Sequence, residues 1–170
     1  MNESVILVDE TDLPLGQMEK QEAHIQGLLH RAFSVFVFND AGALLLQRRA
    51  ITKYHSGGLW TNTCCGHPRP GEDTRIAAQR RLQEEMGLEL ELTPLFHFVY
   101  RAELDQHLTE HEYDHVFVGK TNREPSLNPG EASAHRWISI KMVCEEIERT
   151  PELFTAWFKI AFKSPQIELF

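Results

Sequence analysis

The stretch that decides the fold is GHPRPGEDTRIAAQRRLQEEMGL, residues 66–88. Within it, residues 73–86 predict a helix, because apolar side chains recur at every fourth position and would form one stripe. The members of this stripe are Ala78, Leu82 and Met86. Asp73 or Thr74 can cap the first turn, and Gly87 is a residue that commonly ends a helix. The helix therefore follows directly on a loop rich in Gly and Pro.

The segments on either side of this helix alternate between expected strands and turns. Residues 12–16 and 40–42 predict turns, and residues 56–71 predict an ordered loop whose length suggests function. Residues 141–163 predict amphipathic helix that is interrupted at Pro151. The strands expected from β-branched and aromatic residues are 4–8, 31–39, 44–46, 95–102, 112–119 and 134–139. This order predicts one α/β domain with a mixed sheet.

Composition excludes several classes of partner. The chain has 170 residues and a formal net charge of -8, so wholesale binding to nucleic acid or an anionic membrane surface is disfavoured. No segment approaches the roughly 20 apolar residues that cross a bilayer, and we expect neither membrane insertion nor a signal peptide. Three cysteines, Cys64, Cys65 and Cys144, do not suggest a disulfide framework, so a reducing, cytoplasmic setting is expected. Oligomeric state is not evident from the sequence.

Glycine and charged residues in the run 66–88 follow a fixed spacing. The residues concerned are Gly66, Glu72, Arg80, Glu84, Glu85 and Gly87. This layout resembles the Nudix box, in which carboxylates on one helix face hold Mg²⁺ beside phosphate oxygens. The resemblance implies a Nudix-like α/β/α sandwich around a mixed β-sheet, with residues 1–170 forming a single domain. Where the box has a metal-binding glutamate after its arginine, this chain has Arg81.

Two interpretations of Arg81 are open from the sequence. Arg81 and Glu85 are four residues apart on a helix, so they could form an ordinary salt bridge. Alternatively, an arginine that points at a metal–diphosphate site would bind phosphate and remove a carboxylate used for hydrolysis. Because the rest of the box is intact, we favour phosphate binding. A Nudix hydrolase and a binding module that has lost catalysis are the rival functions.

The segment TNTCCGHP, residues 61–68, carries a candidate reactive cysteine. Cys65 and His67 lie two apart, so in an extended chain both side chains point to one side, whereas Cys64 points to the other. A buried cysteine is commonly an inert small hydrophobe. In a loop that opens a metal-binding box, however, we interpret Cys65 as a reactive thiol and Cys64 as structural.

Histidines and a pair of glutamates suggest a cation site. His24, His30 and His67 could together provide three imidazoles to a divalent cation. Glu110 and Glu112 lie two apart at the start of an expected strand, so their carboxylates share one face. Either group alone has an ordinary explanation as surface or hydrogen-bonded side chains.

Taken together, these segments resemble the type I isopentenyl-diphosphate isomerases, from MEK at 18–20 through HRAFSVFVFN and TNTCCGHP to EHEYDHVF. By that resemblance, Cys65 and Glu112 are the two acid/base residues of the reaction. A divalent cation, Mn²⁺ or Zn²⁺, would be ligated by His24, His30, His67, Glu110 and Glu112. Glu85 would hold a Mg²⁺ that bridges to the substrate, and the diphosphate of the prenyl substrate would be contacted by Lys20, Arg49, Lys53 and Arg81.

The implied reaction interconverts isopentenyl and dimethylallyl diphosphate through a tertiary carbocation. We expect Glu112, aided by Tyr100, to deliver one proton and Cys65, as a thiolate, to remove the other. The face of Trp137 is expected to stabilise the cation, although the residue could equally be packed in the core. A closed pocket must exclude water, and the aromatic segment 154–162 is a candidate for part of its wall.

Overall fold

Strand β3 (His30–Phe38) lies at the centre of the fold, and it carries apolar side chains on both of its faces. In the computed structural model, which describes residues 3–104 and 107–167, Phe33 and Val35 of β3 pack in one core cluster. Phe36 and Phe38 pack in another cluster on the opposite face. Because successive residues of a strand point to opposite faces, a strand that is apolar at both sets of positions must be covered on both sides.

Fourteen segments of regular structure follow one another along the described chain. The strands are β1 Ser4–Val8, β2 Pro14–Glu19, β3 His30–Phe38, β4 Ala43–Arg49, β5 Trp60–Thr61, β6 Cys64–Gly66, β7 Thr93–Glu103, β8 Thr109–Lys120 and β9 Ala132–Ser139. The helices are α1 Lys20–Gln26, α2 Thr74–Met86, α3 Ile140–Arg149, the 3-10 turn η2 Pro151–Leu153 and α4 Ala156–Phe162.

All the strands belong to one mixed sheet. Five of its strands are paired in the order β2-β1-β3-β4-β5. In addition, β6 pairs with β3, β9 with β4, and β7 with β8. β3 and β8 run parallel, with His30 opposite Glu112 at one end and Phe38 opposite Lys120 at the other. The other strand pairings are antiparallel. The parallel pair places the starts of β3 and β8 side by side, which is where the site described below is found.

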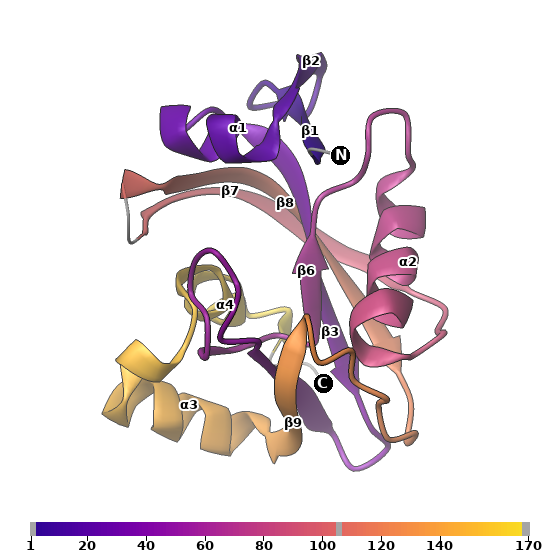
Figure 1. The fold of residues 1–170 in the computed structure, drawn as a ribbon. Coiled ribbons are helices and arrows are strands. Elements are labelled where there is room, and N and C mark those ends of the chain that lie inside the picture. Colours follow the sequence, from indigo (N-terminus) through magenta and orange to yellow (C-terminus); the bar gives the residue numbers. More distant parts are fainter. Residues whose placement is uncertain (1–2, 105–106, 168–170) are drawn as a thin grey trace.

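Helices cover both faces of the sheet (Figure 1). α2 packs Ala78, Leu82 and Met86 against one face, in the cluster that contains Phe33. α4 packs against the other face, in the cluster that contains Phe36. Full burial of a side chain such as Leu82 stabilises the fold by about 1.5–3 kcal/mol. The predicted α/β/α arrangement around a mixed sheet is thus confirmed.

The predicted helix 73–86 is α2, and its caps are as expected. The Asp73 side chain accepts a hydrogen bond from the Ile76 N–H, and Gly87 adopts a left-handed conformation with φ of 65°. A side chain at Gly87 would also meet the carbonyl oxygen of Ser126 at 2.7 Å. Glycine is therefore required there both for its conformation and for this close approach.

Some elements differ from the prediction. The expected loop 56–71 contains β5 and β6, and α1 was not predicted. The expected turn 12–16 overlaps β2, which begins at Pro14 and was not predicted either. β5 and β6 are only two and three residues long, too short for a periodic pattern to be detected. The break at Pro151 is confirmed. Residues 1–2, 105–106 and 168–170 of the predicted domain lie outside the described residues, and no helix within the described part is long and apolar enough to cross a membrane.

Candidate active site

A pocket lies where the start of β3, β6 and the start of β8 meet α1, α2 and α4. It brings together most of the residues singled out in the sequence. From that set its lining contains Lys20, Arg49, Lys53, Cys65, His67, Arg81, Glu85, Glu110 and Glu112. Residues that were given no individual role from the sequence also line it: Glu3, Ser34, Tyr54, His55, Gly66, Glu131 and Trp157.

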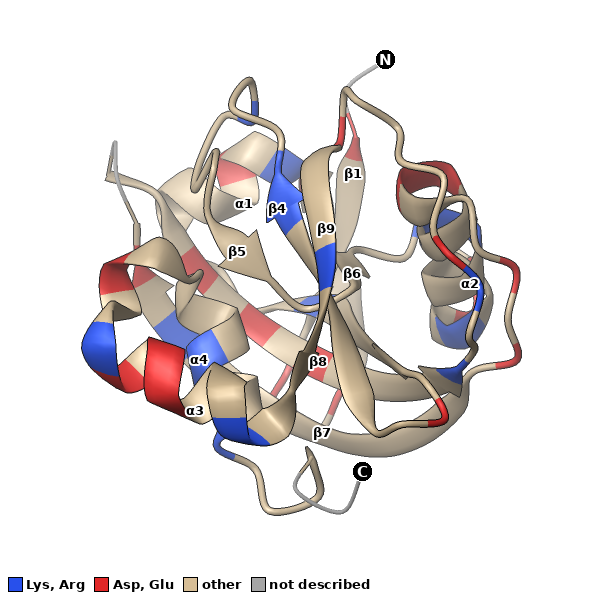
Figure 2. Cartoon of the chain, turned by 90° about the horizontal axis from the view of Figure 1, so that it is seen from below, with Lys and Arg blue, Asp and Glu red and all other residues tan. Residues whose placement is uncertain are grey.

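The four basic residues expected to bind diphosphate converge on this pocket from separate elements. Lys20 begins α1, Arg49 ends β4, Lys53 lies in the loop after β4, and Arg81 projects from α2. Outside the pocket, both basic and acidic residues are found, as on α3 in Figure 2. Convergence therefore brings four basic side chains to one pocket, where glutamates also line the wall.

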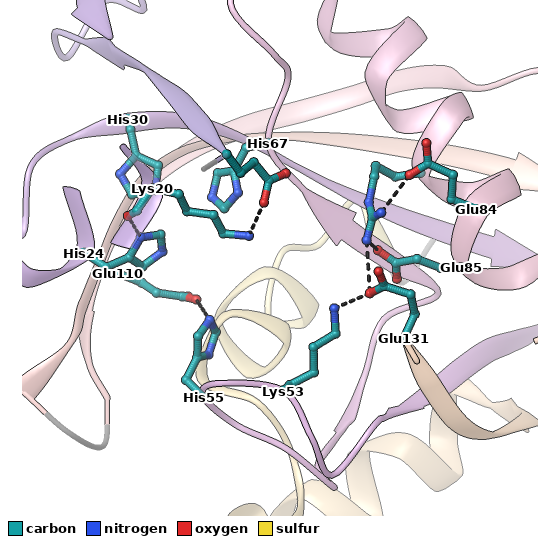
Figure 3. A network of polar contacts seen from close by, with 12 residues as sticks. Lys20, His24, His30, Lys53, His55, His67, Glu84, Glu85, Glu110 and Glu131 are labelled. Atoms are coloured by element: carbon teal, nitrogen blue, oxygen red, sulfur yellow. Dashed lines mark hydrogen bonds and ion pairs between the residues drawn. The ribbon is translucent and has the colours of Figure 1, made fainter. Parts of the chain in front are cut away.

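Carboxylates pair with three of these basic side chains, those of Lys20, Lys53 and Arg81 (Figure 3). Lys20 Nζ lies 2.9 Å from Glu3 Oε2, and Lys53 forms an ion pair with Glu131. Arg81 Nη2 lies 2.6 Å from Glu85 Oε1 and 3.1 Å from Glu131 Oε2. Both Glu3 and Glu131 line the pocket, so an anionic ligand would exchange these carboxylates for its own oxygens.

Glu85 is held in place from two sides. Gln47 donates a hydrogen bond of 2.8 Å from Nε2 to Glu85 Oε2, while Arg81 binds the other carboxylate oxygen. Glu85 is only 4% exposed, so its carboxylate orientation is fixed by these contacts. A fixed carboxylate beside Arg81 in the pocket wall is suited to holding Mg²⁺.

The backbone sets the tautomers of His24 and His30. His24 Nδ1 lies 2.6 Å from the Lys20 carbonyl oxygen, and His30 Nδ1 lies 2.8 Å from the Leu28 carbonyl oxygen. Because a carbonyl oxygen only accepts, each Nδ1 carries the proton and donates it. The Nε2 atom of each ring is then left with a free lone pair, and both Nε2 atoms are buried without a hydrogen-bond partner. This is how metal-ligating histidines are commonly oriented.

His67 and Glu112 complete a group that could hold a divalent cation. One ligand atom from each of His24, His30, His67 and Glu112 lies within 4.8 Å of the others, and all four residues are buried. Burial lowers the pKa of His24, and it lowers that of His67 to about 4, so both imidazoles are held neutral. Neutral imidazole is the form that binds a metal. The residues present thus fit a divalent cation, because the Nε2 lone pairs of His24 and His30 are buried and have no other partner.

Glu110 and Glu112 share the hydroxyl group of Tyr100. Tyr100 Oη lies 2.7 Å from Glu110 Oε2 and 2.6 Å from Glu112 Oε2. Burial and the charge of Glu112 raise the pKa of Glu110. Burial alone would raise the pKa of Glu112 too, but the hydrogen bond from His67 and the nearby imidazole of His30 outweigh it and lower that pKa. Tyr100 is therefore placed to pass a proton between two carboxylates whose pKa values are shifted in opposite directions.

Cys64 and Cys65 lie on opposite faces of β6, as the sequence predicts. Cys64 is fully buried in the cluster beneath α2, whereas Cys65 packs on the other face and lines the pocket. Burial raises the pKa of the Cys65 thiol to about 12. The positive charge of Arg49 acts in the opposite direction and lowers this pKa.

The structure does not bring Trp137 to the pocket. Its side chain extends from β9, packs in the cluster beneath α2, and donates a hydrogen bond of 3.1 Å from Nε1 to Glu124. The indole in the pocket wall belongs to Trp157 of α4, which lies under the guanidinium of Arg49 at 5.1 Å. Trp157 belongs to the segment 154–162, which the sequence analysis named as a candidate wall. Its aromatic content was the available signal, but nothing in the sequence distinguished its tryptophan from that of β9.

Comparison with known proteins places the fold and the site in context. The NUDIX domain family matches residues 28–158 of the chain. The isopentenyl-diphosphate Delta-isomerase of Pectobacterium atrosepticum is 56% identical over 93% of this chain and 88% of that protein. The enzyme of that name from Serratia proteamaculans is 52% identical over 96% and 91%, respectively.

Solved structures support the fold independently. DR0079 from Deinococcus radiodurans has a TM-score of 0.73 at 23% sequence identity, covering 86% of this chain and 90% of its own. The MutT protein from Methanosarcina mazei has a TM-score of 0.68 at 18% identity, covering 83% and 94%. At such low identities these similarities concern the arrangement of strands and helices only.

Proposed function

We propose a mechanism for this pocket from one premise, that the chain belongs to the NUDIX domain family and, within it, to the isopentenyl-diphosphate Delta-isomerases. Its reaction interconverts isopentenyl diphosphate and dimethylallyl diphosphate. The observation that carries the mechanism is that Cys65 and Glu112, whose carboxylate is hydrogen-bonded to Tyr100, line one pocket with four basic side chains. Three requirements follow: the diphosphate must be held, two protons moved, and a cation protected.

The diphosphate is held by Lys20, Arg49, Lys53 and Arg81. Their convergence on one pocket supports this assignment. Arg81 supplies a planar pair of hydrogen-bond donors at the position where a hydrolase of this family has a carboxylate. The site therefore binds the diphosphate but lacks the carboxylate that would activate water for hydrolysis. Binding energy from this end of the substrate fixes the position of the alkene at the other end.

Cys65 and the Glu112–Tyr100 pair are the two proton-transfer groups. One adds a proton to the terminal alkene carbon, and the other removes a proton from the carbon nearer the diphosphate. Because the isomerisation is reversible, each group acts as the acid in one direction and as the base in the other. The hydroxyl of Tyr100, bonded to both glutamates, relays the proton to and from Glu112.

Trp157 protects the tertiary carbocation that forms between the two transfers. It is 3% exposed and lines the pocket, which supports an apolar, electron-rich wall there. The face of a desolvated indole stabilises a cation by about 2 kcal/mol. The packing of α4 around it excludes the water that would otherwise capture the cation.

Two divalent cations complete the site. His24, His30, His67, Glu110 and Glu112 would hold one of them, Mn²⁺ or Zn²⁺, and Glu85 would hold a Mg²⁺ beside the diphosphate. When bound, these ions supply positive charge that orients the glutamates and neutralises phosphate oxygens. The unpaired buried nitrogens of His24 and His30 support the first assignment. The free thiols of Cys64, Cys65 and Cys144 favour a reducing, cytoplasmic setting for the reaction.

Incubation with isopentenyl diphosphate, Mg²⁺ and Mn²⁺ in heavy water tests this proposal directly. We expect dimethylallyl diphosphate to form, with deuterium entering at both carbons that exchange protons and no release of phosphate. Phosphate release without the allylic isomer would instead identify a hydrolase. Isomer formation without deuterium at either carbon would refute the two-group proton transfer.

A further inference from the structure

His55 lies beside the proposed cation centre but was not assigned a role from the sequence. It is located in the loop between β4 and β5, lines the pocket, and is only 8% exposed. Its ring contacts Tyr54 at 4.4 Å and Trp157 at 5.8 Å between centroids. Arg49 donates a hydrogen bond of 3.3 Å to the His55 carbonyl oxygen, which anchors the backbone of the loop at this point.

The ring of His55 faces two of the residues assigned to the cation. His55 Nε2 lies 3.7 Å from Glu110 Oε1 (Figure 3). This distance is longer than a hydrogen bond, so the two atoms face one another without a direct bond. His24 and His55 lie 6.1 Å apart between ring centroids, and His24 Nε2 is buried without a partner. One ligand atom from each of His24, His55 and Glu110 lies within 4.8 Å of the others.

The centre thus has two overlapping sets of ligands that share His24. The first set also contains His30, His67 and Glu112, and the second also contains His55 and Glu110. The first set is supplied by α1, β3, the segment after β6, and β8. The second set adds the loop after β4, which carries Lys53 as well. His55 is therefore the point at which the diphosphate-binding loop meets the cation centre.

We propose that His55 is a fourth imidazole of the cation centre, holding a divalent cation jointly with His24 and Glu110 and linking it to the loop that carries Lys53. This inference rests on the cation centre of the proposed function. It has a consequence for binding: a diphosphate that engages Lys53 fixes the loop, which presents His55 to the cation. Diphosphate and cation should therefore each strengthen the binding of the other.

The alternative is that His55 only packs against Trp157 and Tyr54. His55→Phe distinguishes the two roles, because it keeps an aromatic ring of similar size but removes both nitrogen atoms. The matched control is His135→Phe, since His135 lies outside the pocket, where it pairs with Glu124. Co²⁺ titration, followed by visible absorption and by calorimetry, measures affinity and ligand environment without relying on turnover.

We expect wild type and His135→Phe to bind Co²⁺ alike, and His55→Phe to bind it about 10- to 100-fold more weakly with an altered spectrum. Inorganic diphosphate should tighten Co²⁺ binding in wild type but not in His55→Phe. In His55→Ala, added imidazole should restore the wild-type spectrum. Thermal unfolding of the metal-free proteins checks that the variants fold, and His55→Gln replaces His55→Phe in the titration if the latter does not.

The outcomes separate this inference from the proposed function. Equal Co²⁺ affinity, spectrum and diphosphate dependence in wild type and His55→Phe would overturn the role of His55 and leave the cation centre intact. If wild type itself bound no divalent cation, the cation centre of the proposed function would fail, and the inference with it.

Discussion

The guanidinium of Arg81 lies 2.6 Å from the carboxylate of Glu85 on the same face of α2, and both side chains line the pocket. The two interpretations of Arg81 left open by the sequence are thus compatible. The salt bridge exists, but it lies at the pocket wall, where Arg81 also contacts Glu131 at 3.1 Å. A diphosphate that reaches Arg81 would compete with carboxylates that already orient its guanidinium. If Arg81 binds phosphate as proposed, these contacts preorganise its guanidinium before the substrate arrives.

Replacing Arg81 should weaken diphosphate binding selectively. A hydrogen bond to a charged group is worth about 1.5–3 kcal/mol, so we expect Arg81→Ala to raise KM by about 10- to 100-fold. Calorimetric titration with inorganic diphosphate provides the direct measurement. Arg80→Ala is the control, because Arg80 pairs with Glu72 and Glu84 and does not line the pocket. Equal losses of affinity in the two variants would contradict a phosphate-binding role for Arg81.

The two adjacent cysteines provide a matched pair for the proton transfer. Cys65→Ala should lower kcat by about 10²- to 10⁴-fold while inorganic diphosphate still binds, because it removes only the reacting thiol. Cys64→Ala should keep most of the activity and lose about 1 kcal/mol of stability, because Cys64 is fully buried beneath α2. Steady-state kinetics and urea unfolding test both. Retention of most activity by Cys65→Ala would exclude this thiol from the reaction.

A divalent cation should stabilise the folded chain. At a concentration 100 times its Kd, a ligand adds about 2.7 kcal/mol, which in a protein of this size raises Tm by about 5–10 °C. We therefore expect a chelator to lower Tm and Mn²⁺ or Zn²⁺ to restore it, as followed by calorimetry. His30→Gln should lose this response, because it removes a buried ligand, whereas His135→Gln should keep it. An unchanged Tm in wild type with and without cation would rule the centre out.

Stability should fall in acid as Glu3 loses its ion pair with Lys20. Burial raises the pKa of Glu3, but the charge and hydrogen bond of Lys20 outweigh this and lower it from 4.5 to about 2. Between these values the unfolded chain binds more protons than the folded chain, so the contribution of the pair is complete above about pH 4.5 and is lost as the pH falls towards 2. Glu3 is half exposed, so solvent limits the contribution to about 1 kcal/mol or less.

Urea unfolding of wild type and Glu3→Gln across this range measures the effect. The difference between the two proteins should be largest near neutral pH and should shrink towards pH 2. In a Lys20→Met background, Glu3→Gln should give no such pH-dependent difference. A difference that persisted at pH 2, or that survived in the Lys20→Met background, would show that the ion pair is not its source.

Much of the fold could be predicted from local sequence patterns, because the apolar residues that form those patterns are the ones that pack in the core. The stripe of Ala78, Leu82 and Met86 faces the core, and the apolar alternation of β3 is covered on both faces. Short elements such as β5 and β6 could not be predicted, since two or three residues carry no period. Their conformation is determined by pairing with distant strands.

For the site too, local features could be predicted from the sequence, whereas contacts between distant segments could not. Sequence order predicted which side chains of β6 and β8 share a face, because alternation within a strand is local. It could not predict that the loop after β4 returns His55 to within 3.7 Å of Glu110, a contact made across 55 residues of chain. Nor could it predict which tryptophan reaches the pocket, because that depends on how α4 packs against the sheet. For this reason Trp137, and not Trp157, was predicted to lie in the pocket.

The two tryptophans permit a decisive comparison. If the indole face of Trp157 stabilises the carbocation, Trp157→Phe weakens a cation–π interaction worth about 1–2 kcal/mol in a desolvated site, and kcat should fall by about 5- to 30-fold. KM should change less, because the substrate carries no cation before the proton is added. Trp137→Phe removes an indole that packs beneath α2 and should leave kcat unchanged. Thermal unfolding of both variants separates loss of packing from loss of catalysis. If Trp137→Phe lowered kcat as much as Trp157→Phe, the tryptophan in the pocket wall would have no special part in the reaction.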